Sequence, residues 1–101
     1  MIARVWQGWT KAQDADRYET HYRSEVAASL RQVPGFRGAR LLRRTVGDET
    51  EFISLTFFDD LAAIHLFAGD DHETAVIADE ARAVLVRFDD RVRHYETTFE
   101  T

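Results

Sequence analysis

The sequence has no cysteine, a single proline and no long apolar run, and each absence excludes a class of structure. Without cysteine there is no disulfide framework, no thiolate nucleophile and no thiolate metal ligand. The apolar runs are far shorter than the roughly 20 residues that cross a bilayer. The N-terminal MIARVWQGW also lacks the continuous apolar segment of a signal peptide. We therefore expect a cytoplasmic protein that makes no contact with a membrane.

Several catalytic and binding motifs are also missing. No serine lies in a GxSxG context, and there is neither a glycine-rich phosphate loop nor a dinucleotide fingerprint. Hydrolase, kinase and nicotinamide chemistry are therefore not predicted. The 18 acidic residues outnumber the 13 lysines and arginines, which gives a formal net charge of -5. A negative field repels phosphate backbones, so nucleic acid is not an expected partner.

What the sequence does contain is typical of a globular domain. Hydrophobic residues make up 45% and charged residues 31% of the 101 positions. No serine-, glycine- or proline-rich tract marks a linker, and no internal repeat is visible. We expect one domain over residues 1–101.

Alternation predicts a strand at the N-terminus. Between Ile2 and Thr10, large apolar residues occupy both faces, with Ile2 and Trp6 on one face and Val5 and Trp9 on the other. This pattern indicates a strand that is covered on both sides.

A long helix and a hairpin follow. Asp14 is expected to cap a helix that runs to about Gln32, because apolar residues recur there at helical spacing until a Pro-Gly pair ends it. The segments FRGARLLRRTV and EFISLTFF then predict two strands joined by a turn at Gly47.

The C-terminal half predicts a split helix and a last strand. Asp60 precedes a short helix over residues 61–68, which Gly69 closes. A second helical stripe runs from Ile77 to Phe88, and the alternating RVRHYETTF predicts the final strand.

This order of elements predicts an α+β fold of the ferredoxin-like β-α-β-β-α-β type, with a four-stranded antiparallel sheet and a split second helix. Both helices lie on one face of such a sheet, so its other face meets water or a partner. The strand over EFISLTFF carries large apolar side chains on both faces, Phe52 and Phe58 on one and Ile53, Leu55 and Phe57 on the other, so the open face is too apolar for water. We therefore predict a homodimer in which two sheets pack together.

At this level the chain resembles the antibiotic biosynthesis monooxygenase-like family of the dimeric α/β-barrel superfamily. The likeness rests on RVWQGWT, GFRGARLLRR, FDDLAAIHLFAGDD and RFDDRVRHYE, and it covers nearly the whole chain. The resemblance implies a small-molecule pocket between sheet and helices. It also implies activities such as cofactor-free oxygenation of polyketide-type phenols and anthrones, quinol oxygenation or haem degradation. We expect cofactor-free oxygenation of an aromatic or polyketide-type molecule.

Haem degradation is the less favoured activity within this resemblance. That branch would call for an asparagine on the first strand, a tryptophan in the short helix and a histidine soon after it. This chain offers Val5 and Phe67 at the first two positions, and only His72 near the third.

Cofactor-free oxygenation requires a base that turns the substrate into a carbanion, and donors that hold the developing oxyanion. His94 in the last strand is the candidate base, because an imidazole has an unperturbed pKa of roughly 6.5. His72, at the expected mouth of the pocket, and Trp6, an indole donor, are the other candidate catalytic residues.

Candidate substrate-binding residues are those that could form flat apolar walls or hold a phenolate: Trp9, Arg40, His65, Phe67 and Tyr95. Adjacent strand residues point to opposite faces, so His94 and Tyr95 are not expected to line one pocket together. Each of these residues also has a purely structural interpretation, in the core, at an interface or on a solvated face.

Two further alternatives stay open. The acidic turn Asp70, Asp71 and Glu73 could hold a divalent cation, but no HxH or HExxH spacing is present and no metal site is predicted. The protein could also be a ligand-binding or accessory protein of the same fold, or a non-oxidative cyclase or isomerase. A pocket lined only by Phe, Leu and Val would contradict a catalytic function.

Overall fold

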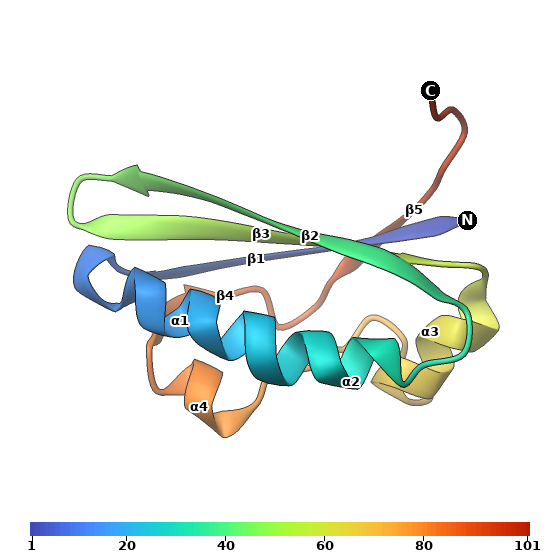
Figure 1. The fold of residues 1–101 in the computed structure, drawn as a ribbon, viewed down its shortest axis with the longest axis horizontal. Coiled ribbons are helices and arrows are strands. Elements are labelled where there is room, and N and C mark those ends of the chain that lie inside the picture. Colours follow the sequence, from blue (N-terminus) through green and yellow to red (C-terminus); the bar gives the residue numbers. More distant parts are fainter.

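A computed structural model describes residues 1–101, and in it an antiparallel sheet carries a layer of helices on one face (Figure 1). The long strands are β1 (Ile2–Lys11), β2 (Phe36–Val46) and β3 (Glu49–Phe58), in the order β2-β3-β1. The short strands β4 (Leu85–Phe88) and β5 (Arg93–Glu96) pair with different stretches of the free edge of β1. The predicted α+β fold with an antiparallel sheet is confirmed.

One continuous helical segment forms most of the helix layer. It begins with a 3-10 turn (Ala12–Asp14), continues through α1 (Ala15–His21) and a π turn (Tyr22–Val26), and ends with α2 (Ala27–Arg31). The predicted helix is therefore present, although the Asp14 side chain makes no capping hydrogen bond. None of the helices combines the length and apolar character that a membrane crossing needs.

The predicted hairpin and short helix are confirmed. Strands β2 and β3 join at Gly47, whose φ of 64° is a left-handed conformation that favours glycine. Helix α3 (Leu61–Ala68) begins at Asp60, whose side-chain oxygen accepts a hydrogen bond from the Ala63 backbone N–H at 3.0 Å. It ends at Gly69, where φ is 87°.

Residues 77–88 do not form the second helix that the sequence predicts. Only α4 (Asp79–Arg82) is helical, and Leu85–Phe88 is strand β4, which pairs with Gly8–Thr10 of β1. Backbone hydrogen bonds to the open edge of β1 outweigh a short helical pattern that also fits a strand. The predicted last strand is short, Arg93–Glu96, and both β4 and β5 pair with the edge of β1 where a single fourth strand was expected.

Alternation along the strands separates the two faces of the sheet. On β3, every second side chain from Thr50 to Phe58 is buried, and these side chains face the helices. Trp6 lies on the same side, only 7% exposed, and its rings stack on Tyr18 with centroids 6.0 Å apart. Phe52 contacts Tyr18 with a centroid distance of 4.7 Å. These aromatic side chains make the core beside the cavity described below.

The opposite face of the sheet carries no helix (Figure 1). Ile53, Leu55 and Phe57 of β3 are half-buried there. Leu42 of β2 and Tyr95 of β5, on the same face by strand register, are 46% and 54% exposed. The predicted apolar open face is therefore present in the single chain.

Candidate functional site

A cavity between the sheet and the helix layer, beside β1, is called the main cavity here for the polar groups that meet in it, although the groove described next is wider. Of its 15 lining residues, 11 are hydrophobic. Large side chains form most of the wall, among them Trp6, Tyr18, Tyr22, Leu30, Phe67 and Ile77. Walls of this kind suit a flat, mainly apolar molecule.

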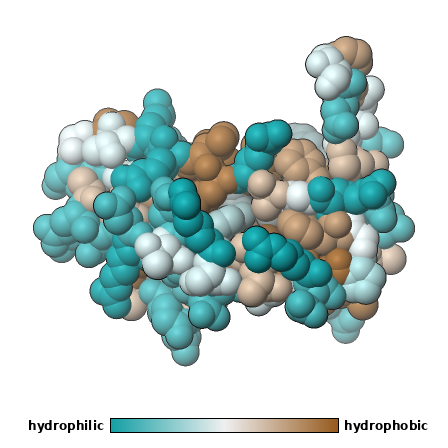
Figure 2. Space-filling model, in the orientation of Figure 1, coloured by the Kyte–Doolittle hydropathy of each residue, from teal (hydrophilic) through white to brown (hydrophobic).

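A second hollow runs between β2 and the helix layer. Figure 2 shows hydrophobic surface at this boundary, where Leu30, Phe36 and Leu41 lie. No histidine and no buried charged side chain lines this groove. The main cavity is therefore the candidate functional site.

Polar groups converge inside the main cavity. Arg4 reaches it from β1, His21 from α1, and Ser54 and Thr56 from β3. The Tyr22 hydroxyl, at the start of the π turn, lies 2.7 Å from Ser54 Oγ. Burial raises the pKa of Tyr22, so its hydroxyl stays protonated and can donate. The cavity therefore has the polar groups that a purely apolar binding pocket would lack.

His21 is the histidine that lines this cavity. Its ring centroid lies 6.5 Å from that of Tyr18, and its Nε2 is buried without a hydrogen-bond partner. A free imidazole nitrogen in a cavity can accept a hydrogen bond or a proton from a bound molecule. The sequence patterns did not single out His21. The available signal was its spacing of three residues from Tyr18, which places both on one helical face.

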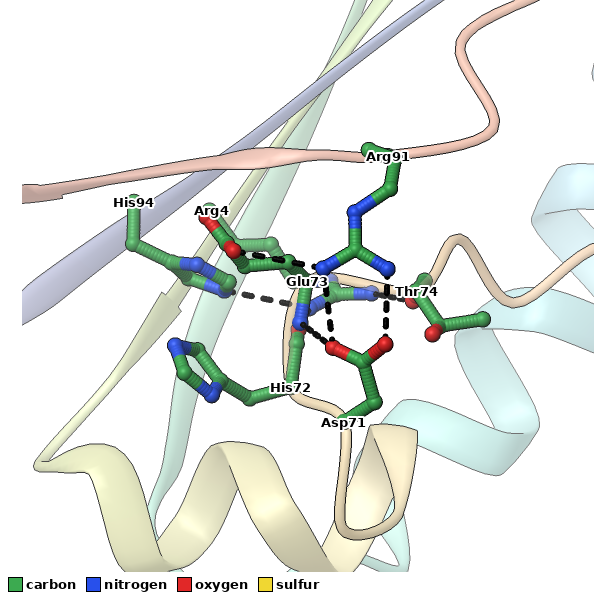
Figure 3. Close-up of polar contacts among 7 residues, drawn as sticks. All are labelled: Arg4, Asp71, His72, Glu73, Thr74, Arg91 and His94. Atoms are coloured by element: carbon green, nitrogen blue, oxygen red, sulfur yellow. Dashed lines mark hydrogen bonds and ion pairs between the residues drawn. The ribbon is translucent and has the colours of Figure 1, made fainter.

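Arg4 is the second site residue that the sequence patterns did not single out, although it alternates with Ile2 and Trp6 on the helix-facing side. Only 4% of Arg4 is exposed. Its Nη1 donates to the carbonyl oxygen of His72 and its Nη2 to that of Thr74, the latter at 2.6 Å (Figure 3). Burial lowers the pKa of Arg4 to about 10, so the group is still charged at neutral pH.

His94 lies opposite Arg4 in the β1–β5 register, on the helix-facing side of the sheet. Its Nε2 is 3.0 Å from Arg4 Nη1 and accepts a hydrogen bond, so the neutral ring carries its proton on Nδ1. That Nδ1 is buried and has no partner. Burial, followed by the nearby charge of Arg4 and the neighbouring His72 ring, lowers the pKa of His94 to about 4. His94 is not among the residues that line the main cavity.

His65, His72 and His94 form a row beside Arg4. The ring centroids of His65 and His72 are 5.3 Å apart, and those of His72 and His94 are also 5.3 Å apart. Gly69 ends α3 as predicted, yet the chain turns back so that His72 still reaches His65. The row brings together one predicted substrate-binding residue and two predicted catalytic residues, outside the main cavity.

The acidic residues near this row pair with an arginine. Arg91 binds Asp71 at 2.6 Å and Glu73 at 3.3 Å (Figure 3), and it lowers the pKa of Asp71 to about 2. No group of three or more His, Asp or Glu side chains is placed to hold a metal ion.

The remaining predicted site residues divide between the two faces of the sheet. Trp6 and Phe67 line the main cavity. Trp9, Arg40 and Tyr95 lie on the open face by strand register, so they do not reach this cavity. They could contact a ligand only at a site on that face, and their role in substrate binding stays a prediction.

The sequence of residues 1–79 matches the family described as antibiotic biosynthesis monooxygenase. The chain belongs to this family. The resemblance seen in its sequence segments is thereby confirmed. A search of curated proteins found no match to the chain.

Solved structures of the antibiotic biosynthesis monooxygenase fold superpose on nearly the whole chain. The haem degrader MhuD from Mycobacterium tuberculosis is 18% identical, with a TM-score of 0.71 over 100% of this chain and 99% of that one. SnoaB from Streptomyces nogalater, described as a cofactor-independent oxygenase, is 19% identical, with a TM-score of 0.63 over 99% and 95%. A protein of Nitrosomonas europaea, described as a putative monooxygenase of this family, is 13% identical, with a TM-score of 0.72 over 98% and 100%. At such identities these likenesses establish the fold.

Proposed function

We propose that this protein is a monooxygenase that oxidises an aromatic or polyketide-type molecule in the main cavity without a bound cofactor. The observation that carries the proposal is the convergence of an unpartnered imidazole nitrogen and protonated hydroxyls inside a largely hydrophobic cavity. Membership of the antibiotic biosynthesis monooxygenase family supports it. The cytoplasmic location expected from the sequence stays a prediction.

In the proposed reaction His21 takes a proton from an acidic C–H of the substrate, and the Tyr22–Ser54 hydroxyl pair donates to the oxygen on which charge develops. The carbanion reduces dioxygen and forms a C–O bond, which gives a hydroperoxide once protonated. Loss of the second C–H proton and cleavage of the O–O bond release water and leave a carbonyl group. The substrate supplies all four electrons, so the equation balances as CH₂ plus O₂ gives C=O plus H₂O.

His94 was the base expected from the sequence, and its catalytic role stays a prediction. With a pKa of about 4 and its Nε2 against Arg4, the ring is a weak base that accepts a hydrogen bond from a cation. We therefore assign the base to His21 and a positioning role toward Arg4 to His94.

Haem degradation is not proposed for this chain. Val5, which the sequence placed at the asparagine position of the haem-degrading branch, points to the open face of the sheet. The β1 residues that line the cavity are Arg4 and Trp6, so this strand brings no asparagine into the cavity. The His72 ring lies against two other histidine rings.

The test is oxygen uptake by metal-stripped, haem-free protein offered a panel of anthrones, hydroquinones and catechols. Uptake proportional to protein, with one atom of labelled dioxygen in the product, is expected, and heat-denatured protein gives the background. Turnover that persists without oxygen would instead indicate a cyclase or isomerase. Binding without any turnover would indicate an accessory ligand-binding protein.

We also propose that the protein is a homodimer whose two sheets pack through their open faces. The support is the apolar side chains on a face that no helix covers, with Leu42 46% and Val46 62% exposed. Several exposed apolar side chains on one uncovered face are typical of an interaction site. A face that repeats in each copy suits a symmetric dimer.

A further inference from the structure

Arg4 is a buried cation that the proposed oxygenation does not use. It is 4% exposed, it lines the main cavity, and its guanidinium carbon lies 5.6 Å from the ring centroid of Phe67. Taking a charge out of water is unfavourable unless an opposite charge or hydrogen bonds offset the lost hydration. The groups that contact Arg4 therefore decide whether its charge is balanced within the protein or can bind an anionic ligand.

The partners that Arg4 has are all neutral. They are the carbonyl oxygens of His72 and Thr74 and the Nε2 of His94, a ring that is uncharged at neutral pH. None of the ion pairs in the structure includes Arg4. The nearby acidic side chains, Asp71 and Glu73, face Arg91 instead (Figure 3). The positive charge at the cavity is thus not balanced by a partner within the protein.

The guanidinium also retains free donors. Of its five N–H groups, Nη1 uses one toward His72 and one toward His94, and Nη2 uses one toward Thr74. The Nε–H and one N–H of Nη2 make no hydrogen bond to the protein. The Nε–Nη2 edge of an arginine is one that binds a carboxylate through two parallel hydrogen bonds.

We propose that Arg4 binds a carboxylate of the substrate, and that the substrate is therefore an aromatic acid whose rings lie against Trp6 and Phe67. This inference deepens the proposed function and rests on the main cavity being the substrate site. His94 acts as a positioning residue, because its hydrogen bond holds Nη1 in place, while the Nε–H and one N–H of Nη2 remain for the ligand. The net charge of -5 repels anions in general, so a preference for an acid requires a local site.

The test compares naphthoate with naphthamide, a neutral probe of the same size, by calorimetric titration of the full chain at neutral pH. The wild type is expected to bind naphthoate about tenfold or more tightly than naphthamide, the scale of a charge-assisted pair. Arg4→Met is expected to remove this preference and to leave naphthamide binding within about threefold. The control is Arg17→Met, an exposed arginine of α1 without an ion pair, which is expected to keep the preference.

Equal affinity of the wild type for the two probes, absence of binding by both, or a preference that survives in Arg4→Met would overturn the inference. Circular dichroism checks that each variant is folded. If Arg4→Met does not fold, the same titrations are made with Arg4→Lys, which keeps the positive charge but lacks the paired N–H donors of a guanidinium. A preference that falls severalfold in Arg4→Lys supports the proposal, and an unchanged preference overturns it.

Oxygen uptake is measured separately, so that the two proposals can fail independently. A preference for naphthoate without oxygen uptake from any phenol or anthrone would contradict the oxygenation and support the acid site. Uptake with neutral anthrones, together with equal binding of the two probes, would support the oxygenation and contradict the acid site.

Discussion

At the scale of single residues, the site is defined by how each histidine is held. The Nε2 of His21 has no hydrogen-bond partner in the cavity. The Nε2 of His94 instead contacts Arg4, and the lowered pKa of His94 keeps its ring neutral at pH 7. Two histidines of the same chain therefore have different chemistry. Burial and the nearest charge, rather than residue type, separate a candidate base from a positioning residue.

Replacing His21 tests the assignment of the base. His21→Gln is expected to lower turnover by about 10² or more, the usual scale for losing a general base, while the melting temperature changes little. Steady-state oxygen uptake measures the effect, and Arg23→Gln, an exposed residue of the same helical segment, is the control. If His21→Gln keeps the normal rate and His94→Ala lowers turnover by about 10² or more, the general base is His94, as the sequence predicts.

The lowered pKa of His94 makes stability depend on pH. Below an unfolded pKa of 6.5 the unfolded chain binds a proton at His94, and the folded chain does not until about pH 4. Stability from this residue is therefore complete above pH 6.5 and falls as the pH drops toward 4.

Urea unfolding across this range measures the pH effect in the wild type and in His94→Gln, which cannot titrate. The wild type is expected to lose more stability on acidification than the variant. The groups facing His94 are Arg4, His72 and Glu73. Parallel stability curves for the two proteins would show that His94 titrates normally in the folded state.

At the scale of elements, strand β1 positions the site. It pairs with β3 along one edge and with β4 and β5 along the other, so it lies inside the sheet. Trp6 on this strand donates from Nε1 to the Asp89 carbonyl oxygen at 3.1 Å, which ties the segment between β4 and β5 to the cavity wall. Gly8 leaves the space in which the Trp6 indole lies over the strand.

Filling that space tests the packing of β1. A Cβ at residue 8 would clash with ring carbons of Trp6, so Gly8→Ala is expected to displace the indole and cost about 1–3 kcal/mol of stability. The same change should cost less in a Trp6→Phe background, because the smaller ring lacks the clashing atoms. Denaturant unfolding of the two single variants and the double variant measures this coupling. Additive losses would mean that Trp6 does not occupy this space.

At the scale of the whole molecule, the two faces of the sheet differ in what covers them. The helix layer covers one face and encloses the cavity, and the other face stays apolar and uncovered (Figure 1). The chain after β5 also extends away from the body, with Phe99 80% exposed. A second copy would cover the open face without closing the cavity, which lies on the opposite side of the sheet.

A charge on the open face tests the dimer. The wild type is expected to have twice the 11.7 kDa chain mass by sedimentation equilibrium, and Ile53→Glu is expected to shift it toward the monomer, because an unpaired carboxylate would be buried at the interface. Ala28→Glu, on the exposed side of α2, is the control. A wild-type mass of one chain, or an unchanged mass in Ile53→Glu, would contradict packing through this face.

The sequence by itself determined the elements with strong local signals. The Asp60 cap, the Gly69 stop and the turn at Gly47 depend on backbone geometry that neighbouring residues set, so α3 and the hairpin could be predicted. The alternation that puts Trp6 and Trp9 on opposite faces is equally local, because it follows from the pleat of a strand. These signals were sufficient for the fold class and for the resemblance to the family.

The tertiary structure alone decided how the remaining parts meet. Leu85–Phe88 became a strand because the edge of β1 was free to pair with it, which no short segment reveals. The contact between Arg4 and His94 joins residues 90 positions apart, and the pKa of His94 depends on that contact and on burial. His21 became a site residue because the helix layer places it over the cavity. Local patterns set the backbone, and long-range packing sets the charge, burial and partners that give a side chain its chemistry.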